Sequence, residues 1–185
     1  MIAAPCLNTE IENLRKENQD LKNFLFKFDI SYPIFTTKLI GGTKGDKIFS
    51  IPKELYDNWK LFHINIYHDH FCTTGIEMFY INEQKEVKSF KFGKGQGIKK
   101  SLEFKTNEVV EKLIINAGDL IDGITIDTNN CSVFGRIEKV GGTGHFFDIK
   151  KLSEIFKKKI ELIGFEGKYS KYINQIKAIF KFIDH

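Results

Sequence analysis

The spacing of apolar residues divides the chain into two unlike parts. Between residues 9 and 28 there is no Gly or Pro, and apolar residues recur at alternating steps of three and four. This heptad pattern is typical of a coiled coil. After Pro33 the pattern changes to period-two alternation interrupted by glycine, which is typical of strands. We therefore predict a coiled-coil dimerisation helix over residues 1–30 and a β domain over residues 31–185.

The predicted seam favours a parallel two-stranded coiled coil. It consists of Leu7, Ile11, Leu14, Asn18, Leu21, Leu25 and Phe28. One polar residue at an a position, here Asn18, fixes the register of such a pair. Thr9 and Glu12 form a capping box that is expected to start the helix. The alternative is an amphipathic helix that packs on its own domain, because so short a helix is only marginally stable alone.

The rest of the chain repeats a strand-rich unit three times. Glycine clusters begin at Gly41, Gly93 and Gly141, and each is followed by an apolar run. Such a period indicates one supersecondary unit used three times. Helical signal is confined to Ile149–Lys159, so we predict an all-β domain. The expected strands are Phe62–Tyr67, Gly75–Ile81, Lys99–Phe104, Lys112–Ile115, Gly123–Asp127, Glu161–Phe165 and Gln175–Phe180.

Several short motifs occur in an order that matches a known family. They are GGTKGD, SLEF, EVVEKLIIN, ITIDTNN, GGTGHFFDI and IELIGFEGKYSKYINQI. From about Ile34 to Ile183 the chain resembles a jacalin-related lectin domain of the mannose type. The resemblance implies a β-prism I fold of three four-stranded Greek keys. It also implies reversible sugar binding, no catalysis and no cofactor.

In lectins of this kind, a sugar pocket combines a glycine-rich loop with a Gly-x-x-x-Asp loop. The third repeat keeps both parts: Gly118, Asp119, Leu120, Ile121 and Asp122, with Gly141 and Gly142 opposite. A carboxylate can accept two charge-assisted hydrogen bonds from adjacent sugar hydroxyls. The resemblance therefore makes Asp122 the sugar acceptor, with the N–H groups of residues 119–121 beside it. The alternative is a solvated turn whose Asp side chains bind local N–H groups.

A second predicted pocket departs from the family pattern. Gly41 and Gly42 would pair with a loop of Ser170, Lys171, Tyr172, Ile173 and Asn174. Ser170 stands where glycine belongs and Asn174 where aspartate belongs, so weaker or altered binding is expected. Tyr172 could stack on a sugar or fill the pocket. The equivalent loop of the first repeat, Asp69–Gly75, is expected to bind nothing.

Composition narrows the remaining possibilities. The net charge of +4 is too small for the basic stripe of a nucleic-acid binder. Three widely spaced cysteines indicate neither a zinc site nor a disulfide framework. The first residues do not resemble a secretory signal, which favours the cytoplasm. Contact with anionic membranes through the lysine-rich segment 150–185 is a less favoured interpretation.

The sequence thus predicts a lectin for mannose- or glucose-like glycans, dimerised by its N-terminal helix. No metal or other cofactor is expected. The alternative is a cytosolic scaffold whose β domain has lost sugar binding and contacts proteins or anionic lipid.

Overall fold

The computed structural model describes residues 4–130, 133–134 and 141–183. A long helix, α1 (Ala4–Leu25), precedes a body of strands and two shorter helices, α2 (Leu55–Asn58) and α3 (Ile149–Phe156). The strands are β1 (Phe28–Ser31), β2 (Ile34–Thr37), β3 (Ile40–Gly41), β4 (Lys47–Phe49), β5 (Lys60–His68), β6 (Thr73–Ile81), β7 (Val87–Gly93), β8 (Ile98–Glu103), β9 (Val110–Ala117), β10 (Ile121–Thr128), β11 (Val133–Phe134), β12 (Thr143–Asp148), β13 (Lys159–Tyr169) and β14 (Ile173–Ile183).

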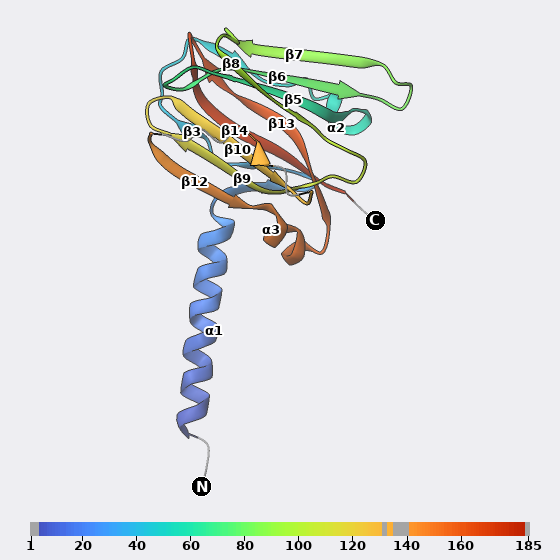
Figure 1. Ribbon diagram of the computed structural model, residues 1–185. Helices are drawn as coiled ribbons and strands as arrows, with labels where there is room; N and C mark the ends of the chain where they lie inside the picture. The colour runs from blue at the N-terminus through green and yellow to red at the C-terminus, as the bar shows by residue number, and fades with distance from the viewer. Residues whose placement is uncertain (1–3, 131–132, 135–140, 184–185) are drawn as a thin grey trace.

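The strands form three antiparallel sheets (Figure 1). The second sheet has the order β7-β6-β5-β8 and the third the order β11-β10-β9-β12. In the first sheet β13 and β14 form the central pair, β4 adds to β13, and β2 and β3 add to β14. Each sheet therefore has a central hairpin, β5–β6, β9–β10 or β13–β14. The first strand of the hairpin pairs outward with β8, β12 or β4, and the second strand pairs outward with β7, β11 or β2 and β3. The second and third sheets have four strands each and the first has six, so the chain is mostly β, as predicted, and the strand order around the central hairpin recurs in all three sheets.

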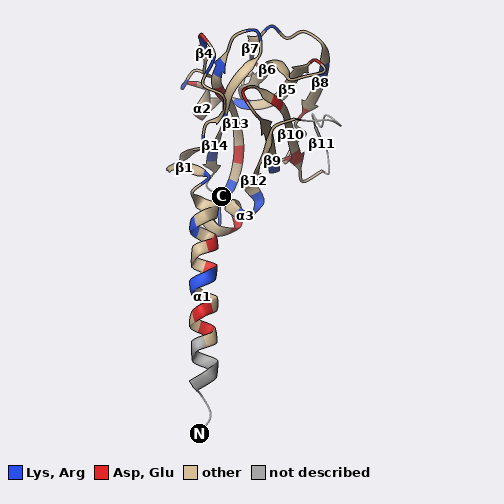
Figure 2. Cartoon of the chain, turned by 90° about the vertical axis from the view of Figure 1, so that its left-hand side faces the viewer, with Lys and Arg blue, Asp and Glu red and all other residues tan. Residues whose placement is uncertain are grey.

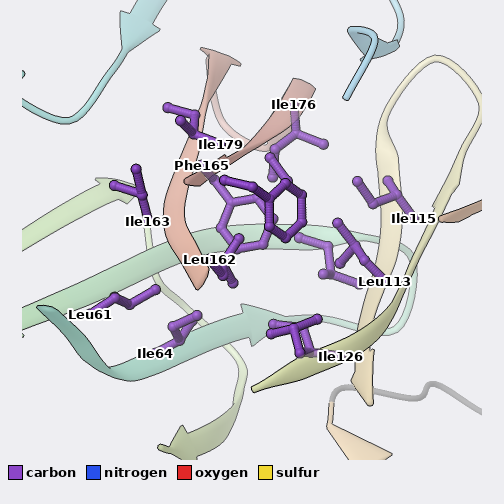
Figure 3. Packing of buried hydrophobic residues seen from close by; sticks show 14 of the residues in the cluster. Leu61, Ile64, Leu113, Ile115, Ile126, Leu162, Ile163, Phe165, Ile176 and Ile179 are labelled. Carbon is purple, nitrogen blue, oxygen red and sulfur yellow. The ribbon is translucent and has the colours of Figure 1, made fainter. Parts of the chain in front are cut away.

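The three sheets bury their inner faces against one another. Figure 3 shows Ile64 of the second sheet, Leu113 of the third and Phe165 of the first pointing into a common core, and all three are fully buried. Between the sheets, the buried Tyr80 hydroxyl donates to the carbonyl of Ile163 at 3.0 Å. This satisfies a polar group that would otherwise be costly to bury. The body is thus one continuous core.

Helix α1 stands away from the sheets (Figures 1 and 2). Every residue from 9 to 23 is exposed, including Ile11, Leu14 and Leu21 of the predicted seam. In its last turn, Phe24 and Leu25 pack against the core of the body. None of the described helices is long and apolar enough to cross a membrane.

Two predictions about this segment are wrong. Phe28 does not continue the helical seam, because it begins β1 and is buried against Phe24, Phe35 and Phe147 with ring centroids 5.6–5.9 Å apart. Thr9 does not start the helix, which already extends from Ala4. Leu25 packs partly on the protein's own body. The exposed seam therefore ends at Leu21; the side chain of Leu7 lies outside those that the structure describes.

The only helix predicted within the β domain is confirmed as α3. Asp148 caps its first turn by accepting from the Lys151 N–H at 2.9 Å, and Lys157 ends it in the left-handed conformation. The single turn α2 was not predicted. It is four residues long, too short to show helical periodicity.

Candidate functional site

Three hairpins carry the same irregularity at the same end of the body. In β9–β10, Ala117 pairs with Ile121 but Asn116 pairs with Gly123, so Asp122 is an extra, unpaired residue. This is a β-bulge, which turns one side chain out of the regular alternation. The two other central hairpins bulge at the corresponding step.

The bulges make three residues equivalent. In β13–β14, Tyr169 pairs with Ile173 and Lys168 with Gln175, leaving Asn174 unpaired. In β5–β6, His68 pairs with Thr73 and Tyr67 with Gly75, leaving Thr74 unpaired. Asp122, Asn174 and Thr74 thus occupy one position of the threefold repeat.

The loops before two of these residues have the same backbone turn. The Gly118 N–H donates to the Leu120 carbonyl at 3.1 Å, and the Ser170 N–H donates to the Tyr172 carbonyl at 3.0 Å. In the first repeat the loop is one residue longer, and the Asp69 N–H reaches the Cys72 carbonyl at 3.1 Å. The Gly-x-x-x-Asp loop and its Ser170–Asn174 counterpart are therefore the same structure with different side chains.

Glycine is required where the opposing loops approach these bulges. A Cβ on Gly41 would lie 2.3 Å from the Asn174 carbonyl oxygen, and one on Gly93 would lie 2.4 Å from that of Thr74. Both glycines also have positive φ, +105° and +81°, which L side chains rarely adopt. The glycine clusters of the first two loops therefore serve the same close approach in two repeats.

The Asp122 carboxylate faces the predicted glycine partner. A Cβ on Gly142 would lie only 2.4 Å from Asp122 Oδ2, and one on Gly141 would lie 3.8 Å from it. The side chain is half-buried, and this burial raises its pKa, although the hydrogen bond from the Gly118 N–H opposes the rise. Gly118 and Asp119 are exposed beside it, whereas Ile121 is fully buried and offers only its backbone. The structure thus brings the predicted residues of this pocket together.

The Asn174 side chain is much less accessible. It is 3% exposed, and its Oδ1 accepts from the Ser170 hydroxyl at 3.1 Å. A Cβ on Gly45 would lie 3.3 Å from both Oδ1 and Cβ of Asn174, so this glycine covers the amide. The closest glycines to Asn174 are Gly41, at its carbonyl, and Gly45, at its side chain.

Gly42 belongs to the boundary between the two pockets. A Cβ there would meet the Asp119 carbonyl oxygen at 2.5 Å, so the loop after β3 lies against the Gly118–Asp122 loop. The prediction that paired Gly42 with the Ser170–Asn174 loop alone was therefore incomplete. The two candidate pockets are neighbours at one end of the body.

The third equivalent position was not predicted as a counterpart. Thr74 is buried, and its hydroxyl donates to the Gln96 carbonyl in the Gly93–Gly97 loop. The side chain is therefore used to fix its own glycine loop. Only the bulge identifies it, because the longer loop of the first repeat shifts the sequence spacing by one residue.

The loop of the first repeat contacts the Ser170–Asn174 loop. The Asp69 carboxylate accepts from the N–H groups of Phe71 and Cys72 at 2.9 and 3.0 Å, and the Tyr172 hydroxyl also bonds to it. These bonds lower the pKa of Asp69 against the opposing effect of desolvation. Tyr172 is thus turned toward Asp69, with Lys171 Nζ 4.8 Å from the centre of its ring.

Cys72, in the same loop as Asp69, is buried. Desolvation, together with the charges of Asp69 and Asp122, raises the pKa of its thiol to about 12, which keeps it an unreactive thiol at neutral pH. Within the described ranges, no three His, Cys, Asp or Glu side chains gather as a metal site would require. What this end offers a ligand is the half-buried carboxylate of Asp122, the exposed carboxylate of Asp119, exposed loop backbone and several polar side chains.

These features place the chain among β-sheet binding domains of the lectin type. The chain belongs to the Jacalin-like lectin domain family, whose model matches residues 37–179. Members of this family bind carbohydrate without catalysing a reaction, in agreement with the expectation that the chain is not an enzyme. A comparison with curated proteins finds no matching sequence.

Solved structures with the same fold include plant and animal proteins. A mannose-binding jacalin-related lectin from Ananas comosus has a TM-score of 0.65 at 16% identity, covering 82% of this chain and 99% of that one. Malaysian banana lectin has a TM-score of 0.62 at 15% identity, covering 81% and 98%. A lamprey immune protein has a TM-score of 0.64 at 20% identity, covering 82% of this chain and 45% of that one.

Proposed function

We propose that the protein is a lectin that binds mannose- or glucose-like glycans through the Asp122 pocket. In this proposal the body is a β-prism I of three Greek keys. The strand order β8-β5-β6-β7 supports it, because a Greek key places its fourth strand beside its first. Asp122 accepts from two sugar hydroxyls, and Gly118, Gly141 and Gly142 leave room for the ring. The backbone N–H groups of residues 119–121 are the remaining donors.

The observation that carries the proposal is the setting of the Asp122 carboxylate. The bulge turns it out of the sheet, Gly142 permits its approach, and the Gly118 N–H is its one hydrogen-bond partner within the described residues. Acceptor capacity of the ionised carboxylate therefore remains. A half-buried carboxylate also forms stronger hydrogen bonds than a fully solvated one, because the local dielectric is lower.

The identity of the sugar rests on similarity. The Ananas comosus lectin is mannose-binding, and artocarpin, with a TM-score of 0.61 at 17% identity, has been solved with methyl α-mannose. These proteins are too distant to transfer a specificity by residue identity. They support mannose and glucose as the first sugars to test.

The second pocket is the weaker neutral-sugar site in this proposal. Asn174 offers one acceptor oxygen, which already binds Ser170, and its side chain is almost fully buried. A sugar there would contact mainly Gly41, Gly42 and the exposed Lys171. We expect binding at Asp122 to dominate.

Dimerisation through α1 is part of the proposal. An isolated helix of about this length is marginally stable in water, and residues 9–23 of α1 are all exposed. A parallel partner would bury Ile11, Leu14 and Leu21, and would pair two Asn18 side chains across the seam. A dimer in the cytoplasm would present two sugar-binding domains together.

Isothermal titration of the full chain with methyl α-mannoside tests the sugar site. The Asp122→Ala variant is expected to lose binding by about 100-fold or more, since two charge-assisted hydrogen bonds are removed. The Asn174→Ala variant is the matched control and should change the affinity less than about threefold. Equal loss in both variants, or unchanged binding in Asp122→Ala, would contradict the assignment of the pocket.

A scaffold without sugar binding is the second candidate. The burial of Asn174 and the replacement of glycine by Ser170 favour it, because they close one of the two pockets. A glycan array on the wild-type chain separates the candidates. No signal with any neutral or charged glycan would support the scaffold and exclude the lectin.

A further inference from the structure

The two neighbouring pockets differ in charge. Residues 118–122 and 141–144 contain two aspartates and no lysine, whereas residues 41–47 and 168–174 contain Lys44, Lys47, Lys168 and Lys171 against the single Asp46. The same turn therefore presents a carboxylate in one pocket and an amide surrounded by ammonium groups in the other.

Of these lysines, Lys168 is the one that lies beside Asn174. The Cβ of Lys168 lies 3.0 Å from the position that a Gly45 Cβ would occupy, beside the Asn174 side chain. Lys47 pairs with Tyr169 in the β4–β13 ladder, and its Nζ lies 5.9 Å from the centre of that ring. Lys44 is exposed in the loop between Gly42 and Gly45. Both loops thus contribute lysines: Lys168 beside the Asn174 side chain, and Lys47 over Tyr169, the next residue along β13.

Lys171 lies on the side of the pocket that faces the first repeat. Its side chain is exposed above Tyr172 and hydrogen-bonds to it, and the carboxylate of Asp69, which accepts from the Phe71 and Cys72 N–H groups, also acts on it. On the other side, Asp119 contributes a backbone contact to Gly42. For Lys44, Lys47 and Lys168, the described residues contain no ion pair within 4.0 Å.

The backbone of the same loop also suits an anion. Gly41 and Gly45 have φ of +105° and +137°, and neither carries a side chain that would shield the backbone N–H groups of this loop from an anion. With aspartate at position 174, a carboxylate would repel an anion there. Asn174 removes that charge and keeps an amide donor and acceptor.

We propose that the Gly41–Gly45 and Lys168–Asn174 loops bind a phosphate or sulfate ester carried on a sugar or polyol ring. The ring lies against the glycine loop and Tyr172, and the ester oxygens contact the loop N–H groups and the ammonium groups of Lys47, Lys168 and Lys171. This site is distinct from the neutral-sugar site at Asp122, and each of the two proposals can be tested without the other.

Titration with mannose 6-phosphate, mannose and inorganic phosphate tests this site. Mannose 6-phosphate should bind at least tenfold more tightly than either of the others in the Asp122→Ala background, and its affinity should fall steeply with salt. Lys47→Ala combined with Lys171→Ala should weaken it about tenfold or more. Lys85→Ala combined with Lys88→Ala, an equal loss of two charges in the turn before β7 and at the start of β7, should have no effect.

Two further measurements keep the outcome interpretable. Asn174→Asp should reduce binding of the phosphorylated sugar while its melting temperature reports whether the buried substitution is tolerated. Vesicles containing phosphatidylinositol 4-phosphate distinguish a lipid headgroup from a soluble glycan: sedimentation with them but not with neutral vesicles indicates the lipid source. Equal affinity for mannose and mannose 6-phosphate in the Asp122→Ala background, with no vesicle binding, would overturn the proposal. Loss of neutral-sugar binding alone would contradict only the function assigned to Asp122.

Discussion

At the scale of single residues, the site depends on what a β-bulge does to one side chain in each repeat. Asp122, Asn174 and Thr74 share a backbone position but not an environment: the first faces a glycine and keeps free acceptor capacity, the second is covered, and the third binds its own loop. The three positions therefore offer a ligand different chemical groups, although each carries the same β-bulge.

Asp122 should make sugar binding sensitive to acid. Burial raises the pKa of its carboxyl group, so the ionised acceptor is lost at a higher pH than for a solvated aspartate. Affinity for methyl α-mannoside should decline as the pH falls toward the range of ordinary carboxyl groups, about pH 4. Titrations across this range would check it; a constant affinity down to pH 4 would show that the carboxylate is not the acceptor.

The raised pKa of Asp122 also predicts that removing its charge leaves the fold as stable or slightly more stable, although it abolishes sugar binding. Because the pKa is higher in the folded than in the unfolded state, this group stabilises the fold below its unfolded pKa, and that contribution disappears as the pH rises through the folded pKa. At neutral pH, Asp122→Asn should therefore melt at the same temperature as wild type or up to about 3 °C higher. Asp119→Asn, at an exposed carboxylate in the same loop, is the control and should not shift the melting temperature. A marked decrease for Asp122→Asn would indicate a structural role.

Two glycines test how closely the strands must approach. A Cβ on Gly167 would lie 1.9 Å from the Gln175 carbonyl oxygen, whereas nothing lies within 4 Å of a Cβ on Gly118. Gly167→Ala should destabilise the fold by about 2 kcal/mol or more, because the obstacle is backbone that cannot rotate away. Gly118→Ala should stay within about 1 kcal/mol of wild type. Urea denaturation measures both, and equal stabilities would contradict the close packing of β13 on β14.

At the scale of elements, α1 is exposed along its length and joined to the body at its last turn. The exposed part of the seam runs from Ile11 to Leu21, while Phe24, Leu25 and Phe28 are used by the core. Removing residues 1–28 would therefore damage the fold as well as the seam. A truncation that tests dimerisation has to end before Phe24.

A pair of substitutions in α1 tests the dimer without touching the core. Light scattering should give a dimer for the full chain, and Leu14→Glu should convert it to a monomer by placing two like charges in the seam. Asn13→Glu adds the same charge outside the heptad seam and should remain dimeric. A monomeric wild-type chain would exclude the coiled coil.

Of the strands that the sequence predicted correctly, all but the six-residue β8 have eight residues or more. The seven predicted strands correspond to β5, β6, β8, β9, β10, β13 and β14. The others were missed because β1–β4, β11 and β12 are six residues or fewer, and β7 buries none of its seven residues, so neither length nor alternation identified them. The end of α1 could not be predicted from heptad spacing alone, because Phe28 falls at a heptad position and is also apolar enough for the core.

The candidate site was only partly predictable for a related reason. Gly118–Asp122 and its glycine partner are contiguous motifs that can be read along the chain. The equivalence of Thr74 and the position of Gly42 between two loops depend on strand register and on contacts between repeats. Neither leaves a local pattern in the sequence.

At the scale of the whole molecule, the proposed dimer joins two weak sites through one helix each. The helix contacts neither candidate pocket, so breaking the seam should leave binding of a single sugar unchanged. Binding to a densely mannosylated surface should fall by about 100-fold or more in Leu14→Glu, because effective concentration is lost. Surface plasmon resonance beside titration with the monosaccharide checks this. A parallel loss in both assays would mean that the helix supports the pocket itself.

The first sheet joins distant parts of the chain. Thr36 of β2 pairs with Ile179 of β14, and Ile48 of β4 pairs with Lys168 of β13. During synthesis, the ribosome releases α1 first, and this sheet stays open until β14 has emerged. Contacts between residues so far apart in sequence form late and slowly. If the proposed coiled coil forms, two nascent chains on one messenger RNA would join through their helices before either body has closed, which would favour pairing between products of the same transcript.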